Sequence, residues 1–120
     1  MKVVVSSQGE RLDSPVDGRF GRSQSFVLVD TETGEASGID NSENLNALQG
    51  AGVQAAKKVA DLGAEAVVAT NVGPKAFSVL SAAGVKVFSG ASGTVADAIE
   101  QLKAGKLAEA DSANVQSRWS

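Results

Sequence analysis

Three glycines divide the second half of the chain into two segments of equal length. Gly63, Gly84 and Gly105 lie 21 residues apart. Each interval holds a short β-branched run, then a glycine-containing loop, then apolar residues at helical spacing. Two successive strand–helix units of this kind are typical of a parallel sheet with short connections. The spacing therefore predicts an α/β fold.

The hydrophobic spacing also places the elements within these two units. The first unit predicts a strand over 66–70 and a helix with Ala76, Phe77, Leu80 and Ala83 on its inner face. The second predicts a strand over 85–89 and a helix with Val95, Ala98, Ile99 and Leu102 inside.

The first half of the chain has a different pattern, which predicts an antiparallel hairpin. A β-branched run over 2–6 predicts a central strand buried on both faces. Strands are also predicted over 25–30 and 35–40, joined by a turn at Thr31–Gly34. A helix that ends at Gly63 follows, with inner residues Leu48, Ala51, Gly52, Ala55, Val59 and Leu62.

Together these elements predict a mixed five-stranded sheet with helices on both faces. We expect the order 3-2-1-4-5, with strands numbered along the chain, because it keeps the first strand central and permits right-handed crossovers. The predicted α/β domain spans 1–105. Residues 106–120 lack periodicity and predict a mobile C-terminal tail.

Composition narrows the possible functions. A chain of 120 residues supports one hydrophobic core. The formal charge of −3 argues against binding to nucleic acid or anionic membranes by bulk electrostatics. Because no apolar run approaches the roughly 20 residues of a membrane span, we expect a cytoplasmic protein.

The absence of cysteine and histidine is the sharpest compositional fact. Both count zero, which excludes disulfides, thiolate-ligated iron–sulfur clusters and the common zinc sites. Catalytic pairs such as Cys–His and Ser–His–Asp are excluded as well. We therefore expect a binding protein rather than an enzyme.

Three loops are predicted to meet at the carboxyl end of the sheet, where open α/β sheets usually bind ligands. They are the long polar segment 7–22 and the glycine-containing loops 71–75 and 90–94. Glycine just before a helix leaves N–H groups open to an anion, and Lys75 adds a charge. The alternative is ordinary turn and cap chemistry, with Thr94 and Asp97 as a capping box.

The segment Asp17–Ser23 concentrates two arginines around an aromatic ring. Arg19 and Arg22 suit directional binding of an anion, and Phe20 offers an apolar face to a polarisable ligand. In the alternative reading, the arginines pair with Asp13 and Asp17 while Phe20 fills the core. Asp13, Asp17 and Asp30 give weak support to a hydrolytic metal site, and 41–46 is read as a solvated connection.

These motifs resemble the dinitrogenase iron–molybdenum cofactor biosynthesis family. The likeness rests on the opening Val-Val-Val-Ser-Ser with Leu12-Asp13, on Asp17-Gly18-Arg19-Phe20-Gly21-Arg22, on Asn71-Val72-Gly73-Pro74 and on Gly90 to Thr94. It spans nearly the whole chain and implies a three-layer ribonuclease-H-like fold.

The resemblance also implies a cargo. One branch of the family is associated with an anionic molybdenum–copper sulfide cluster that is held non-covalently, which fits a chain without cysteine or histidine. No residue is then expected to ligate a metal directly. The residues expected to hold the cluster are Arg19, Phe20, Arg22, Val72, Gly73, Lys75, Gly90, Ala91, Ser92, Gly93 and Thr94.

Two other functions remain open at this point. The chain could instead be an adaptor that docks on a partner ATPase through the 25–40 hairpin or the tail, with no metal cargo. A hydrolase is the third reading, and it rests on fold-level analogy alone.

Overall fold

The computed structural model describes residues 1–42 and 50–110. Its elements, in chain order, are β1 (Lys2–Ser7), β2 (Ser25–Asp30), β3 (Ala36–Asp40), α2 (Ala51–Asp61), β4 (Ala66–Val68), α3 (Pro74–Ala82), β5 (Lys86–Ser89), α4 (Val95–Lys103) and β6 (Ala108–Glu109). Leu48, expected on the first helix, lies outside the described residues. None of the described helices is long and apolar enough to cross a membrane.

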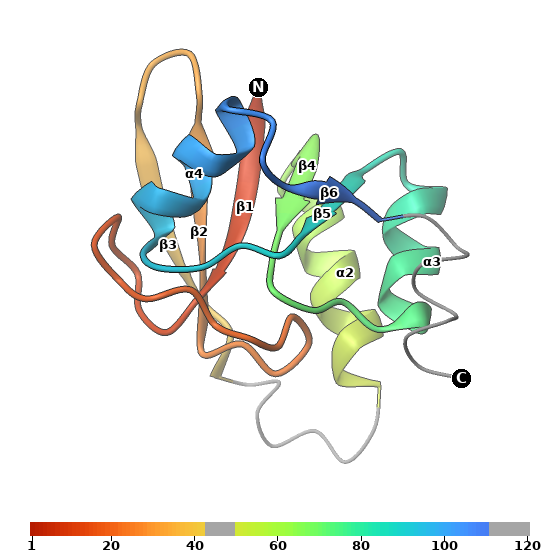
Figure 1. Cartoon of the computed structure of the whole chain (residues 1–120). Coiled ribbons are helices and arrows are strands. Elements are labelled where there is room, and N and C mark those ends of the chain that lie inside the picture. The colour runs from red at the N-terminus through yellow and green to blue at the C-terminus, as the bar shows by residue number, and fades with distance from the viewer. Residues whose placement is uncertain (43–49, 111–120) are drawn as a thin grey trace.

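The strands form one mixed sheet in the order β3-β2-β1-β4-β5-β6 (Figure 1). The predicted order of the first five strands is confirmed, but the prediction of five strands is wrong. The sixth strand, β6, pairs antiparallel with β5 through Phe88↔Glu109 and Ser89↔Ala108. Two residues are too few to show the alternation that identifies a strand in sequence.

The same strand corrects the predicted boundary of the tail. The Ala110 N–H donates to the Val87 carbonyl at 2.8 Å, and Ala110 packs against the core. Residues 106–110 therefore belong to the domain. The remainder of the predicted tail, 111–120, lies outside the described residues.

The central position of β1 follows from its sequence. Val3, Val4 and Val5 are fully buried, because successive side chains point to opposite faces and both faces are covered. Val3 and Val5 pack with α4, whereas Val4 packs with α2 and α3. Figure 1 shows the same three layers, with α4 on one side of the sheet and α2 with α3 on the other.

The regular glycine spacing has a conformational cause. Gly63, Gly84 and Gly105 each follow a helix with φ of 78°, 79° and 71°. Residues with a side chain rarely adopt this left-handed conformation, so glycine is the favoured helix terminator. The 21-residue period thus marks two strand–helix units that end in the same way.

Candidate anion-binding site

The last part of the connection between β1 and β2, residues 17–24, carries Arg19 and Arg22 and is called the arginine loop below. Asp17 is 6% exposed, and its carboxylate accepts hydrogen bonds from the main-chain N–H groups of Arg19 at 3.0 Å and Gln24 at 3.2 Å. The Arg19 Nε atom lies 3.8 Å from Asp17 Oδ1, yet the Arg19 side chain stays 69% exposed. The buried carboxylate therefore shapes the loop and leaves a guanidinium at its surface.

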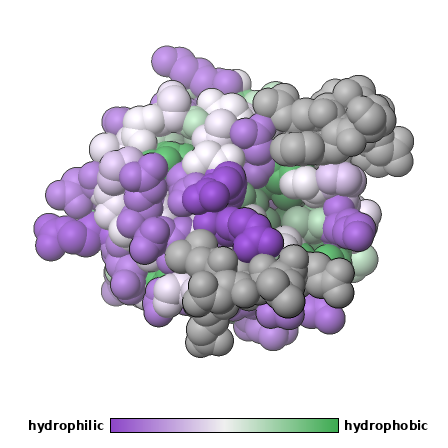
Figure 2. All heavy atoms as spheres, turned by 90° about the horizontal axis from the view of Figure 1, so that it is seen from below, coloured by the Kyte–Doolittle hydropathy of each residue, from purple (hydrophilic) through white to green (hydrophobic). Residues whose placement is uncertain are grey.

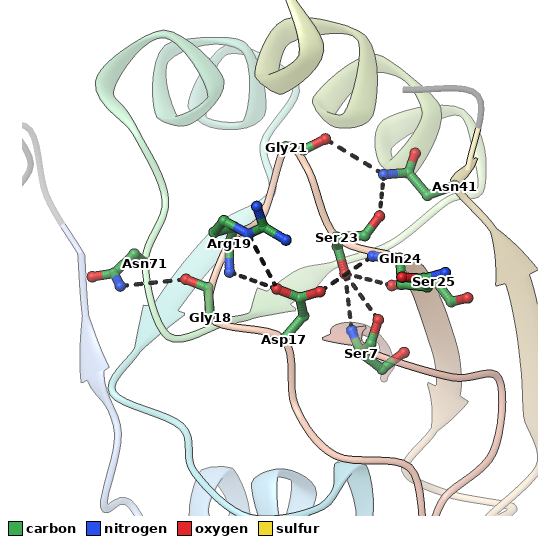
Figure 3. Close-up of polar contacts among 10 residues, drawn as sticks. All are labelled: Ser7, Asp17, Gly18, Arg19, Gly21, Ser23, Gln24, Ser25, Asn41 and Asn71. Carbon is green, nitrogen blue, oxygen red and sulfur yellow. Dashed lines mark hydrogen bonds and ion pairs between the residues drawn. The ribbon is translucent and has the colours of Figure 1, made fainter. Parts of the chain in front are cut away.

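Ser23 ties the arginine loop to the end of β1 (Figure 3). Its hydroxyl accepts a hydrogen bond from the Ser7 N–H at 3.1 Å. The same Oγ atom lies within donating distance of the Ser7 and Ser25 carbonyls, at 3.1 and 2.7 Å. Ser23 is fully buried, so these contacts replace water for a hydroxyl inside the protein.

Asn41 holds the loop from the end of β3. Its Nδ2 atom donates to the Ser23 carbonyl at 2.8 Å and to the Gly21 carbonyl at 3.4 Å. Asn41 is fully buried, so the prediction of a solvated connection is wrong for this residue. Residues 43–46 of that predicted connection lie outside the described residues.

Asn71 holds the loop from the other side, after β4. Its Nδ2 atom donates to the Gly18 carbonyl at 3.3 Å (Figure 3). Its Oδ1 atom is buried and has no hydrogen-bond partner. Asn41 and Asn71 thus fix main-chain carbonyls of the arginine loop from two different strands.

Phe20 anchors the loop in the core. The residue is 2% exposed, and its ring centroid lies 5.4 Å from that of Phe26 with the planes at 45°. Tilted aromatic pairs at this separation are favourable beyond the area they bury. The alternative reading of Phe20 as a core residue is therefore confirmed, although the residue also borders the cavity described next.

A cavity of about 400 Å³ lies between the arginine loop and the two helices α2 and α3. It is at the carboxyl end of β1 and β4, the end viewed in Figure 2, where hydrophilic residues gather at the centre of the surface. Its lining residues are Gly18, Arg19, Phe20, Gly21, Arg22, Ala51, Gly52, Asn71 and Gly73.

The loop and α2 approach each other closely at this cavity. A Cβ atom on Gly21 would lie 2.7 Å from Gly52 Cα and 2.8 Å from Gly52 N, closer than packed atoms allow. Glycine at position 21 therefore lets the main chain of the loop rest on the first turn of α2. This contact brings the arginines beside the start of that helix.

The helices α2 and α3 both begin at the cavity without a side-chain cap. Gly50 precedes α2 and Gly73 precedes α3, and neither helix has an acidic residue in its first turn. The first N–H groups of a helix have no partner within it, and the helix dipole places positive potential there. Two helix ends and two arginines therefore bring positive charge to the cavity, and the Asp17 carboxylate beside Arg19 offsets only part of it.

The start of α4 is different, because its N–H groups are already bonded. Val95 N donates to the Ser14 carbonyl and Ala96 N to the Leu12 carbonyl, both at 2.9 Å. Thr94 and Asp97 form a capping box. The prediction that this helix start offers free N–H groups to an anion is therefore wrong, and the cap reading of these residues is confirmed.

Only some of the predicted site residues meet at the cavity. Arg19, Phe20, Arg22 and Gly73 line it. Val72 is 5% exposed and packs in the core, while Lys75 is the exposed second residue of α3, outside the lining. Gly90, Ala91, Ser92, Gly93 and Thr94 also lie outside the lining.

The three carboxylates that give weak support to a metal site lie apart. Asp13 is exposed and pairs with Arg11 at 3.3 Å, whereas Asp17 is buried in the arginine loop. Asp30 lies at the opposite end of the sheet, 4.0 Å from the N-terminal ammonium. Within residues 1–42 and 50–110, no group of three acidic residues is placed to hold a metal ion.

The comparisons with known proteins agree with this architecture. Residues 1–105 match the family model described as dinitrogenase iron-molybdenum cofactor. The chain belongs to this family. A Methanocaldococcus jannaschii protein described as uncharacterized is 33% identical over 109 residues, which is 89% of each chain.

Two solved structures extend the family match to three dimensions. The apo form of the orange protein from Desulfovibrio gigas is 39% identical with a TM-score of 0.88, covering 91% of this chain and 92% of that one. A NifB-related protein from Thermotoga is 37% identical with a TM-score of 0.79, covering 90% and 91%. This chain is thus a member of a cofactor-associated family and shares the α/β fold of the orange protein.

Proposed function

We propose that this protein binds an anionic molybdenum–copper sulfide cluster as its cargo, non-covalently, in the cavity beside the arginine loop. One observation carries the proposal: two arginines and the uncapped starts of α2 and α3 line the same cavity. The family membership and the similarity to the orange protein support a cofactor-related cargo. The molybdenum–copper composition comes from the family resemblance.

The charge of the cavity suits an anion of more than one charge. Arg19 and Arg22 each carry a full positive charge, and each helix start contributes about half a charge. The Asp17 carboxylate, 3.8 Å from Arg19, offsets one of these positive charges, so the sum remains positive. Guanidinium groups are weakly hydrated and donate several directional hydrogen bonds, so they lose little when they bind a soft anion. Because Arg19 is largely exposed, we expect this attraction to weaken as salt increases.

The donor set fits a cluster that brings its own ligands. The chain has no thiolate or imidazole to offer a metal, since cysteine and histidine both count zero. Sulfide atoms on the outside of a cluster can instead accept hydrogen bonds from main-chain N–H groups and guanidinium groups. The cavity volume of about 400 Å³ is within the usual range for small-molecule sites.

We further propose that the role is binding or carriage and not catalysis. Asp17, which directly precedes the cavity-lining Gly18, already accepts two main-chain hydrogen bonds. Its carboxylate is therefore engaged in holding the loop and is poorly placed to act as a general base. The ribonuclease-H-like assignment of the fold supports a hydrolase by analogy only.

Reconstitution tests the proposal directly. The protein, purified without oxygen, is mixed with tetrathiomolybdate and copper(I), desalted, and analysed for metals and for its visible spectrum. We expect wild-type protein to retain molybdenum and copper. The double variant Arg19→Glu/Arg22→Glu should retain less than about a tenth as much, because two attractive charges become repulsive.

Arg11→Glu is the matched control for charge. Arg11 is exposed, pairs with Asp13 and lies outside the cavity, and its reversal changes the net charge in the same direction. Retention equal to wild type is expected for this variant. A wild-type protein that stays colourless and metal-free, or equal loss in Arg11→Glu, would contradict a site at the cavity.

An adaptor for a partner ATPase, without metal cargo, is the alternative. The observation that favours it is the position of β3, a mostly exposed strand that forms an edge of the sheet among the described strands. Exposed edges can accept a strand from another protein. This alternative predicts that the Arg19→Glu/Arg22→Glu variant still binds the ATPase and that wild type retains no cluster.

A further inference from the structure

The positions of the glycines in this chain give further information about the cavity, independent of its charge. All thirteen lie within the described residues. Seven have a positive φ, between 71° and 91°, which explains glycine at those positions. They are Gly34, Gly50, Gly63, Gly84, Gly90, Gly93 and Gly105.

Three more glycines are explained by close packing. A Cβ atom on Gly9 would meet the Ser14 hydroxyl at 2.6 Å, and one on Gly38 would overlap Glu10. Gly21 lies against Gly52, as described above. In each case a neighbour would have to shift to admit even a methyl group.

The remaining three glycines have neither a positive φ nor a close-packed neighbour, and all three line the cavity. A Cβ atom on Gly18 or Gly73 would meet nothing within 4 Å. On Gly52 it would meet only the Ala76 methyl group, at an ordinary contact distance of 3.4 Å. None of the three has a positive φ. The free chain therefore has room for alanine at each position.

Alanine would also favour the folded state at two of these positions, Gly18 and Gly52. Glycine inside a helix is destabilising relative to alanine, and Gly52 is the second residue of α2. Glycine in a loop adds freedom to the unfolded chain, which again lowers stability. The cavity thus keeps two glycines, Gly18 and Gly52, that neither the backbone nor the packing of the free chain requires. Gly73 has an additional role as the N-cap residue of α3, a position that prefers glycine to alanine.

We propose that the bound anion touches the main chain at Gly18, Gly52 and Gly73, and that these glycines select a compact inorganic anion covered with hydrogen-bond acceptors. The inference rests on the proposed function and adds the contact surface and the class of anion. Without Cβ atoms, acceptor atoms can approach the N–H groups in the first turns of α2 and α3. A tetrahedral thiometallate presents an acceptor in every direction, whereas an extended organic anion would leave these three points uncovered.

Single methyl groups test the proposal. Gly18→Ala, Gly52→Ala and Gly73→Ala are each compared with wild type for unfolding in urea and for the Kd of tetrathiomolybdate, measured by its absorption. We expect midpoints in urea equal to or above wild type for Gly18→Ala and Gly52→Ala. Gly73→Ala should have a somewhat lower midpoint, because alanine is a poorer N-cap residue than glycine. The Kd should rise at least about tenfold in each variant, because the methyl group occupies space that the anion fills.

Ala82→Ser is the control, since it adds one heavy atom at an exposed position of α3 away from the cavity. Its Kd should match wild type. Unchanged Kd values in the three glycine variants, with uptake by wild type intact, would overturn this inference and leave the proposed function standing. Absence of uptake by wild type would overturn both.

A measurement on wild type keeps the inference testable if a variant folds poorly. Tetrathiomolybdate is added to isotope-labelled protein, and amide resonances are followed by NMR. The largest shifts are expected for the N–H groups of Gly18, Gly52, Val53, Lys75 and Ala76. Shifts confined to residues outside the cavity would overturn the proposal.

Discussion

The Asp17 Oδ2 atom accepts a hydrogen bond from the Gln24 N–H at 3.2 Å, and this contact closes the arginine loop on itself. The other oxygen of the same carboxylate takes the Arg19 N–H at 3.0 Å. One buried acid thus fixes both ends of the segment that carries the arginines. Asp17 places a negative charge beside a site for an anion. Its role there is to fix the shape of the loop that carries the arginines.

The variant Asp17→Asn distinguishes two effects of this residue on cluster binding, its hydrogen bonds that shape the loop and its negative charge. An amide keeps one acceptor oxygen but turns an N–H₂ group toward one of the two N–H donors, so a buried hydrogen bond is lost. We expect the free energy of unfolding to fall by about 1–3 kcal/mol. Cluster retention should also fall, although removal of a negative charge alone would raise it.

Asp13→Asn is the control for that variant. Asp13 is exposed and pairs only with Arg11, and exposed ion pairs contribute little. Its stability in urea should stay within about 0.5 kcal/mol of wild type. Tighter cluster binding by Asp17→Asn would show that charge, rather than loop shape, is the role of this residue.

Ser6 and Ser23 are both fully buried, but we expect their replacement by alanine to change the free energy of unfolding in opposite directions. The Ser6 hydroxyl has no hydrogen-bond partner, whereas the Ser23 hydroxyl contacts the main chain of Ser7 and Ser25. Ser6→Ala removes an unsatisfied buried group and should raise the free energy of unfolding by up to about 1 kcal/mol. Ser23→Ala leaves main-chain groups unpaired and should lower it by about 1–3 kcal/mol.

Urea unfolding of the two serine variants checks this contrast. The substitutions remove the same atom from equally buried positions, so each serves as the control for the other. Equal destabilisation by both would mean that the Ser6 hydroxyl has a partner in solution.

The sequence predicts the fold well where local patterns decide it. The equal spacing of Gly63, Gly84 and Gly105 and the β-branched run Val3–Val5 are visible without a structure. β6 is not, because a two-residue strand has no period and forms only against the edge of β5.

The candidate site is predicted less completely, for a physical reason. Arg19 and Arg22 can be found from their local cluster, but Asn41 and Asn71 act across 20 and 53 residues of sequence on the carbonyls of Gly21 and Gly18. The sequence does indicate that Asn41 and Asn71 lie near the site, since each directly follows a predicted strand. Which carbonyl it bonds depends on the sheet order and on burial.

Thr94→Ala tests whether the loop before α4 has a structural role. The Thr94 hydroxyl accepts the Asp97 N–H at 3.2 Å, and loss of such a cap costs about 0.5–2 kcal/mol. We expect lower stability in urea and unchanged cluster retention, because the loop lies outside the cavity lining. Cluster loss without destabilisation would instead make Gly90–Thr94 part of the site.

Asp30 gives the protein a predictable response to acid. The Glu32 N–H, which donates to Asp30 Oδ1 at 2.9 Å, is the main cause that holds the pKa of this carboxyl below its usual 3.8. The pKa of Asp40 is lowered in the same way by Ser42. A carboxyl with a lowered folded-state pKa stabilises the fold above its unfolded value of about 3.9.

The sign of the pH effect follows from that difference. As the pH falls from about 5 through the lowered pKa, the unfolded state takes up protons first, so stability decreases with acid. Asp30→Asn removes one titrating group, and its urea midpoint should therefore depend less on pH across this range than that of wild type. At neutral pH the variant should also lose some stability. The neutral Asn oxygen accepts the Glu32 N–H more weakly than the carboxylate does, and it no longer attracts the N-terminal ammonium 4.0 Å away. Parallel pH profiles for the two proteins would show that Asp30 has the same pKa in the folded and unfolded chains.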